Sequence, residues 1–485
     1  MSSSTTGLRL QLPAGWIEGA HCQDEVITSL PTVRAFKNIP YAAVPGDERR
    51  WLPPQAVEPW AGTRACIDFG SIAVQAAPPG ESGHAGAFDC LSLNVWCPPS
   101  GNGPYPVMVW IPGGGFMRGG AADALYDGRA MARQGIVFVS FNYRIGVEGF
   151  MHFDDASPNR GLQDQQAALQ WVHENIALFG GDSSRVTLAG VSAGAGSITH
   201  LMGLPDCAPL FQRVILQSPS MQSHSLEDAQ RIRHALAGVL GIAPTRQAVA
   251  QVPLADLTRA LASFLGNEAL KHQWGLRPQH YFPLRPVIDG QLLSAEPLQA
   301  IQKQLDLDLD FGLPRKPVLL GSNSEEMRFY LVPNGEIDRI DEARVRAFVD
   351  DIGLPLHRLR EYQENYQEKM ASASWGDVLS CIQSDYYYRL PVQALARQLI
   401  QADCPTFLYE FAWPSPLHGG RLGASHAMEI PFTLGNTGLP RAQAFIGAVP
   451  SEALAHDMHH RWVQFVCGQD MPNWSNTDTN LRIFK

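Results

Sequence analysis

The chain has 485 residues, a net charge of −10, and 45% hydrophobic but only 17% charged residues. Disorder needs low hydrophobicity and high net charge, so this composition excludes a disordered chain and predicts a large buried core. Lys and Arg are not clustered anywhere. An acidic protein without a basic stripe lacks the surface that binds nucleic acid, so no nucleic-acid partner is expected.

Membrane and secretory signals are missing. No run of 18 apolar residues occurs, which predicts no membrane span, and the first residues do not read as a secretory signal. The eight cysteines are scattered and include no C-x-x-C pair, so neither a metal-binding set nor a dense disulfide framework is expected. These features favour reduced, packing cysteines in a cytoplasmic protein.

Strand and helix patterns alternate through the first 200 residues. Runs at 8–12, 91–97 and 107–111 are rich in strand formers, and the run at 136–142 is apolar on both faces, as in a buried parallel strand. Helical spacing follows at 162–178, closed by Gly180 and Gly181. A short strand at 185–189 then leads into another helix.

The second half continues the pattern with longer insertions. Residues 225–303 are expected to be largely helical, strands are expected at 316–321 and 406–411, and a last helix at 453–467. Alternating strands and helices predict an α/β fold with a mostly parallel sheet. Because no linker or repeat interrupts the chain, we expect one domain over residues 1–485.

Residues 190–194 read G-V-S-A-G, between a predicted strand and a helix of small residues. A G-x-S-x-G pentapeptide in this context predicts a sharp turn that exposes the Ser192 hydroxyl, with Gly190 and Gly194 leaving room for neighbouring backbone. The helix start behind the serine adds positive potential where an oxyanion would form. The alternative is a plain glycine-rich turn.

Gly113, Gly114 and Gly115 follow the strand at 107–111. Backbone N–H groups in such a loop, together with the amide of Ala193, are able to form an oxyanion hole. A phosphate-binding loop is the competing interpretation, but no G-K-[ST] sequence follows.

A serine hydroxyl needs a base. His426 lies in a loop before an apolar segment and far enough after Ser192 for an acid to lie between them, which is the order Ser, acid, His. His200 follows Ser192 by only eight residues on the next helix, so we interpret it as structural.

The spacing of residues in the sequence does not by itself identify the acid that would orient His426. Glu325 and Glu326 follow the predicted strand at 316–321, and Asp289 is a third candidate. Either member of the acidic pair could orient an imidazole, or the pair could simply favour the start of a helix.

Several motifs taken in order resemble the type-B carboxylesterase/lipase family, over about residues 36–473. They lie at Phe36–Ala42, Asp89–Asn94, Asn142–Arg144, Asn159–Gln165, Phe179–Asp182 and Gly423–Glu429. The resemblance implies an α/β-hydrolase fold with large helical insertions, and a cholinesterase-like or para-nitrobenzyl-type esterase.

The resemblance also implies residue roles. Ser192 would be the nucleophile, Glu326 the acid and His426 the base. The oxyanion would bind the amides of Gly114, Gly115 and Ala193. Ser218 would support the three catalytic side chains from behind, and Arg144 with Asp164 would form a structural ion pair.

The chain departs from the family pattern at several positions. Val191 replaces a glutamate before the nucleophile, which makes the site less acidic and argues against choline-type cations. Pro112 replaces a histidine before the glycines, and Met327 a glycine after the acid. Ala73 stands where a disulfide partner of Cys90 would be, which supports a reducing compartment.

The sequence therefore predicts a serine ester hydrolase that uses an acyl-enzyme, a small-molecule ester and no cofactor or metal. Hydrolysis of an amide or carbamate on the same residues is the main alternative. A non-catalytic binding protein and acyl transfer to an alcohol are less favoured. The ester's identity and the oligomeric state are left open.

Overall fold

The computed structural model describes residues 8–22, 31–78, 81–99, 103–265, 267–310, 315–369, 374–448, 450–474 and 481–485. The expected absence of a secretory signal concerns the first sixteen residues, and the first seven of them lie outside this range. A 12-stranded sheet has the order β1-β2-β3-β7-β9-β8-β10-β11-β12-β13-β14, with β4 beside β2. A separate pair joins β5 and β6.

The strands have the following bounds: β1 Leu8–Leu12, β2 Gly15–Cys22, β3 Val33–Pro40, β4 Thr63–Ala65, β5 Gln75–Ala76, β6 His84–Ala85, β7 Ser92–Cys97, β8 Tyr105–Ile111, β9 Val137–Phe141, β10 Gly181–Val191, β11 Arg213–Gln217, β12 Val318–Asn323, β13 Thr406–Phe411 and β14 Leu481–Phe484. From β9 through β14 each neighbouring pair is parallel. The predicted mostly parallel sheet is confirmed.

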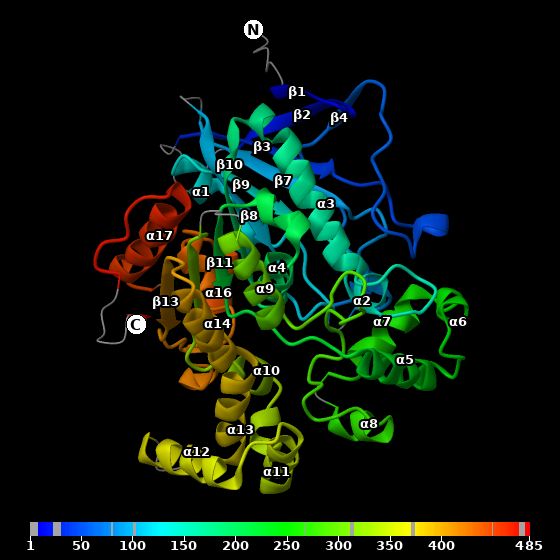
Figure 1. The fold of residues 1–485 in the computed structure, drawn as a ribbon, viewed down its shortest axis with the longest axis vertical. Helices are drawn as coiled ribbons and strands as arrows, with labels where there is room; N and C mark the ends of the chain where they lie inside the picture. The colour runs from blue at the N-terminus through cyan, green and yellow to red at the C-terminus, as the bar shows by residue number, and fades with distance from the viewer. Residues whose placement is uncertain are drawn as a thin grey trace.

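The α-helices have the following bounds: α1 Arg129–Arg133, α2 Gly146–Phe150, α3 Arg160–Asn175, α4 Ala193–Met202, α5 Leu226–Leu240, α6 Arg246–Ala250, α7 Leu254–Ala262, α8 Glu268–Gln273, α9 Pro297–Asp310, α10 Arg328–Leu331, α11 Glu342–Asp351, α12 Leu356–Lys369, α13 Trp375–Ser384, α14 Leu390–Gln401, α15 Ile430–Thr433, α16 Pro440–Ile446 and α17 Glu452–Cys467. Helices α5 to α8 form one lobe beside the sheet, and α11 to α13 lie at the end opposite the N-terminus (Figure 1).

The sheet is buried on both faces. Along β8, Val109 packs in one hydrophobic cluster while its neighbours Met108 and Trp110 pack in the other. This period of two is what a strand with two covered faces requires. Helices α3 and α4 contribute to the first cluster, and α11, α13 and α17 to the second. Helices therefore cover both faces, as in other α/β folds.

Two sequence expectations were wrong in detail. Gly180 ends the helical stretch with a left-handed backbone, but Gly181 already begins β10, which is longer than predicted. Residues 225–303 were expected to be largely helical, yet 274–296 contain no helix. Phe282 and Leu284 are nonetheless buried, so apolar residues of this segment belong to the core without forming a helix.

Neither a membrane span nor a disulfide is found in the described part of the chain. No helix there is both long and apolar enough to cross a bilayer. All eight cysteines lie within the described residues and are thiols.

Candidate active site

Ser192 occupies a strained turn between β10 and α4, with φ of 57° and ψ of −125°. Non-glycine residues rarely adopt positive φ, and such strain, about 1–3 kcal/mol per residue, concentrates at functional sites. The backbone N–H of Ser192 donates to the carbonyl of Gln217 at 2.9 Å. The Ser192 side chain does not cap α4.

The glycines on either side of Ser192 allow close backbone contact, as predicted. A Cβ on Gly194 would lie 2.1 Å from the carbonyl oxygen of Ile111, and a Cβ on Gly190 would lie 2.9 Å from the same oxygen. Real side chains do not approach backbone this closely. The two glycines therefore let the turn pack directly against the end of β8.

His426 and Glu326 contact each other at the carboxyl ends of neighbouring strands. Glu326 follows β12 and His426 lies in the loop after β13, and these two strands pair in parallel. Oε2 of Glu326 lies 2.5 Å from Nδ1 of His426, and the side chains are 0% and 3% exposed. The backbone N–H of His426 also donates to the carbonyl of Glu326 at 3.2 Å, which joins the two loops.

The other candidate acids lie elsewhere. Oε2 of Glu325 accepts the backbone N–H of Ala424 at 3.0 Å, and Oε1 of Glu325 lies 3.3 Å from Arg328. Asp289 accepts hydrogen bonds from Asn159 and from the backbone of its own turn. Of the three carboxylates, Glu326 is the one in contact with the imidazole.

A buried polar network holds the Glu326 loop. Oε1 of Glu326 accepts the backbone N–H of Asn323 at 2.7 Å, while the Asn323 amide donates to Glu429 at 2.7 Å. Gln217 donates to the other oxygen of Glu429 at 3.1 Å. Burial, and secondly the charge of Glu326, raise the pKa of Glu429. The sequence motif containing Glu429 was recognised, but this supporting role was not predicted.

Ser192 and His426 both line a cavity of about 910 Å³. This volume suits a drug-sized ligand. The aromatic side chains of the wall are Tyr126, Tyr281, Phe282, Phe329, Tyr330 and Phe445. A largely apolar cavity next to a serine and an imidazole is suited to an organic substrate with one polar reacting group.

The predicted oxyanion donors lie beside this serine. Gly114 and Gly115 line the cavity with positive φ of 130° and 61°, and Ala193 begins α4 directly after Ser192. No described residue accepts a hydrogen bond from the backbone N–H groups of Gly114, Gly115 and Ala193. They are therefore free to bind an oxygen that develops negative charge.

Two tyrosines that sequence reasoning missed flank His426. The rings of Tyr388 and Tyr330 lie 4.7 and 5.5 Å from the imidazole, centroid to centroid. Burial raises the pKa of Tyr330 to about 12, against the opposing effects of hydrogen bonds with Tyr388 and Ser192. Nε2 of His426 has no hydrogen-bond partner among the described residues. The serine hydroxyl therefore lies beside Tyr330, and no hydrogen bond joins it to Nε2 of His426.

The hydroxyl of Ser218 is buried and has no hydrogen-bond partner among the described residues, so its supporting role stays a prediction. His200 is buried away from the cavity, and burial lowers its pKa to about 3, in agreement with a structural interpretation.

The implied ion pair between Arg144 and Asp164 is present. The guanidinium and carboxylate meet at 2.6 Å, with side chains 2% and 0% exposed, and the carboxylate also accepts the backbone N–H of Arg144. The pair joins the loop after β9 to helix α3 and does not line the cavity.

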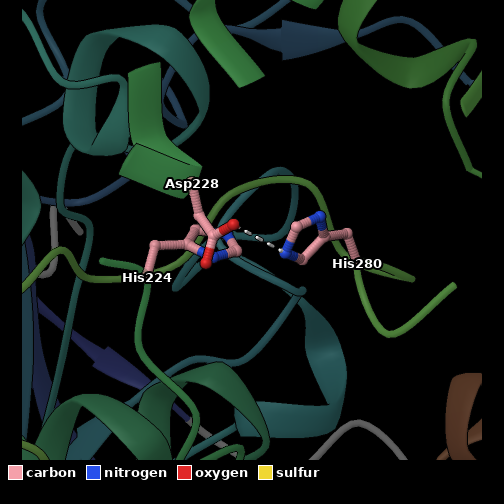
Figure 2. Close-up of side chains that lie close together, drawn as sticks. All are labelled: His224, Asp228 and His280. Carbon is pink, nitrogen blue, oxygen red and sulfur yellow. Dashed lines mark ion pairs between the residues drawn. The ribbon is translucent and has the colours of Figure 1, made fainter. Parts of the chain in front are cut away.

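A second ionisable cluster lies outside the cavity. Ligand atoms of His224, Asp228 and His280 all lie within 4.8 Å of one another (Figure 2). Nδ1 of His280 accepts the backbone N–H of Arg277, so its Nε2 carries the proton and faces Asp228 at 3.7 Å. A metal ligand needs a bare nitrogen, and Asp228 is already shared with Arg231 and Arg277. The cluster fits a structural network at the start of α5 better than a metal site.

Comparisons with known proteins agree with this geometry. A model described as the carboxylesterase family matches residues 6–483. Phenmedipham hydrolase of Pseudarthrobacter oxydans is 30% identical over 448 positions, covering 89% of this chain and 85% of the relative. Para-nitrobenzyl esterase of Bacillus subtilis (strain 168) is 31% identical over 451 positions, covering 89% and 86%.

A solved carboxylesterase of Geobacillus stearothermophilus superposes with a TM-score of 0.78 at 30% identity, covering 97% of this chain and 92% of that chain. This likeness confirms the predicted α/β-hydrolase fold. The chain therefore belongs to the carboxylesterase family and is an ester-hydrolysing enzyme.

Proposed function

We propose that the protein is a serine carboxylic-ester hydrolase in which Ser192, His426 and Glu326 form the catalytic triad. The observation that carries the proposal is the buried contact between Glu326 and His426 at 2.5 Å, beside the cavity that Ser192 also lines. Such a carboxylate fixes the imidazole with Nε2 unprotonated and able to accept a proton.

The proposed reaction has two halves. His426 takes the hydroxyl proton of Ser192, and the serine oxygen attacks the ester carbonyl. The oxyanion binds the backbone N–H groups of Gly114, Gly115 and Ala193, and each such donor typically contributes about 10²–10³ in rate. The alcohol leaves with the proton from His426. Water, activated by the same imidazole, then releases the acid and restores Ser192.

Glu326 stays ionised throughout and stabilises the imidazolium that forms twice in the cycle. Amide or carbamate hydrolysis on the same three residues is the second candidate. The name of one relative, phenmedipham hydrolase, supports keeping a substrate class broader than simple esters. Two comparisons separate these possibilities: an ester against an amide of the same acid, and an ester against a carbamate of the same alcohol.

The experiment that tests the proposal compares the wild type with Ser192→Ala on a neutral aryl ester. Loss of the nucleophile should lower kcat by at least about 10³-fold, with only the oxyanion contribution remaining. Circular dichroism and thermal unfolding of the variant control for the fold. Near-normal turnover by a folded Ser192→Ala protein contradicts the proposal.

We further propose that the chain works as one domain in the cytoplasm. Strands from β1 at residue 8 to β14 at residue 484 belong to one sheet, which supports a single domain. The eight thiols support a reducing compartment, because disulfides persist in oxidising ones. Fractionation of the native cells, with detection of the protein outside the cytosol, would contradict the location.

A further inference from the structure

Not every charged side chain of the catalytic cavity has an ion-pair partner. The charged side chains that line the cavity are Arg118, Asp123, Glu148 and Arg441. Glu148 is paired with Arg50 through two hydrogen bonds, of 2.7 and 3.0 Å. Asp123 is paired with Arg441 at 3.4 Å. These two carboxylates are thereby neutralised by cations other than Arg118.

Arg118 has no such partner. Within the described residues, the guanidinium of Arg118 makes no ion pair, side-chain hydrogen bond or cation–π contact. Arg118 is exposed to solvent, and of the four charged side chains that line the cavity it is the one without an ion-pair partner there. A cation that the fold leaves unpaired beside a reactive serine is available to a ligand.

The backbone of Arg118 packs closely against the loop that contains Gly114 and Gly115. Its backbone N–H donates to the carbonyl of Gly114 at 3.1 Å, and a Cβ on Gly114 would lie 1.8 Å from the Arg118 carbonyl oxygen. The charge of Arg118 also acts on the hydroxyl of Tyr330, which is beside Ser192. Arg118 therefore belongs to the turn that carries Gly114 and lines the same cavity as Ser192.

We propose that Arg118 forms a carboxylate-binding subsite, and that the preferred substrates are esters that carry a free carboxylate on an otherwise apolar frame. This inference rests on the proposed function and names its substrate class. A guanidinium binds a carboxylate through two parallel hydrogen bonds, while the aromatic wall accommodates the apolar frame. Val191, next to the nucleophile, also lines the cavity and carries no charge that would repel such a substrate.

Matched ester pairs test the subsite. For a carboxylate on the acyl part, 4-nitrophenyl hydrogen suberate is compared with 4-nitrophenyl octanoate. For a carboxylate on the alcohol part, the octanoate ester of 4-hydroxybenzoate is compared with that of methyl 4-hydroxybenzoate. The measured quantity is the ratio of kcat/KM for the charged ester to that for its neutral partner, and the pair with the higher ratio identifies which part of the ester Arg118 binds.

Arg118→Gln should lower this ratio about tenfold, as expected for loss of a charge-assisted hydrogen bond. Arg118→Lys keeps the charge and should restore part of the ratio. Arg346→Gln is the matched control, because that guanidinium is paired with Glu342 on α11 and does not line the cavity, and its ratio should stay within about twofold. The Arg118 effect should weaken as ionic strength rises.

A ratio that Arg118→Gln leaves unchanged, or that Arg346→Gln lowers equally, overturns the subsite. Failure of the wild type on all four esters, charged and neutral, instead overturns the proposed function. In that case titration calorimetry with suberate still tests the subsite, because binding needs no turnover. Tighter binding of suberate by the wild type than by Arg118→Gln supports it, and equal binding contradicts it.

Discussion

Oε2 of Glu326 lies 2.5 Å from Nδ1 of His426, although 100 residues separate them in the chain. Both side chains are almost fully buried. The contact exists because β12 and β13 are neighbouring parallel strands, so the loops after them leave the same edge of the sheet. Ligand sites of open α/β sheets lie at this edge.

Glu326→Gln should lower kcat by about 10²–10⁴-fold, because an amide neither stabilises the imidazolium nor fixes its tautomer. Glu325→Gln is the matched control: its carboxylate contacts Ala424 and Arg328, so the variant should keep most of the wild-type kcat. Steady-state kinetics on one neutral ester checks both. If Glu325→Gln is the inactive variant, the assignment of the acid is wrong.

Gly194→Ala should disrupt the turn at Ser192. The added Cβ would lie 2.1 Å from a backbone oxygen of β8, which forces Ser192 from its position. Displacement of a catalytic atom by 1 Å can cost about 10²-fold in rate. Gly438→Ala is the control, because nothing lies within 4 Å of its added Cβ. Equal activity of the two variants would contradict the close packing.

Asp164→Ala should lower the free energy of unfolding by about 3–5 kcal/mol, because it leaves the buried guanidinium of Arg144 without its counter-charge. Urea denaturation followed by fluorescence gives the value. Asp338→Ala removes an exposed partner of Arg421, where water screens the pair, and should hardly move the urea midpoint. Similar midpoints for the two variants would contradict the structural role of the buried pair.

Glu429→Gln should change stability in a pH-dependent way. The pKa of Glu429 is raised above its usual 4.5 by burial and by Glu326. Between pH 4.5 and the higher pKa of the folded protein, the unfolded chain releases the Glu429 proton while the folded chain keeps it. The wild type therefore loses stability as the pH rises through this range, whereas the variant does not. The stability of the variant relative to the wild type should therefore increase with pH above 4.5 and be constant below it. A pH-independent difference in urea unfolding would exclude a raised pKa.

The fold could be predicted from the sequence because each strand, helix or turn pattern depends only on neighbouring residues in one segment. The apolar run at 136–142 contains β9, and the G-x-S-x-G pentapeptide marks the turn between β10 and α4. The acid could not be chosen locally, since Glu325 and Glu326 are adjacent and differ only in the direction of their side chains. The resemblance selected Glu326, the carboxylate that the structure brings to His426.

Contacts between distant segments escaped sequence reasoning. Tyr388 lies beside His426 because residues 385–389 pack against the loop that carries the imidazole. No sequence pattern in either segment indicates this contact. Arg118 follows the glycine loop by three residues, a signal that was present, but its lack of an ion-pair partner is a property of the assembled cavity.

The most direct test of the catalytic account is the intact mass of the protein after reaction with a fluorophosphonate, followed by peptide mapping. The serine oxygen attacks phosphorus and fluoride leaves, so the account predicts one adduct per chain, on the peptide containing Ser192, and none on Ser192→Ala. An adduct on another residue, or an unmodified wild-type protein under conditions in which it hydrolyses an ester, would contradict it.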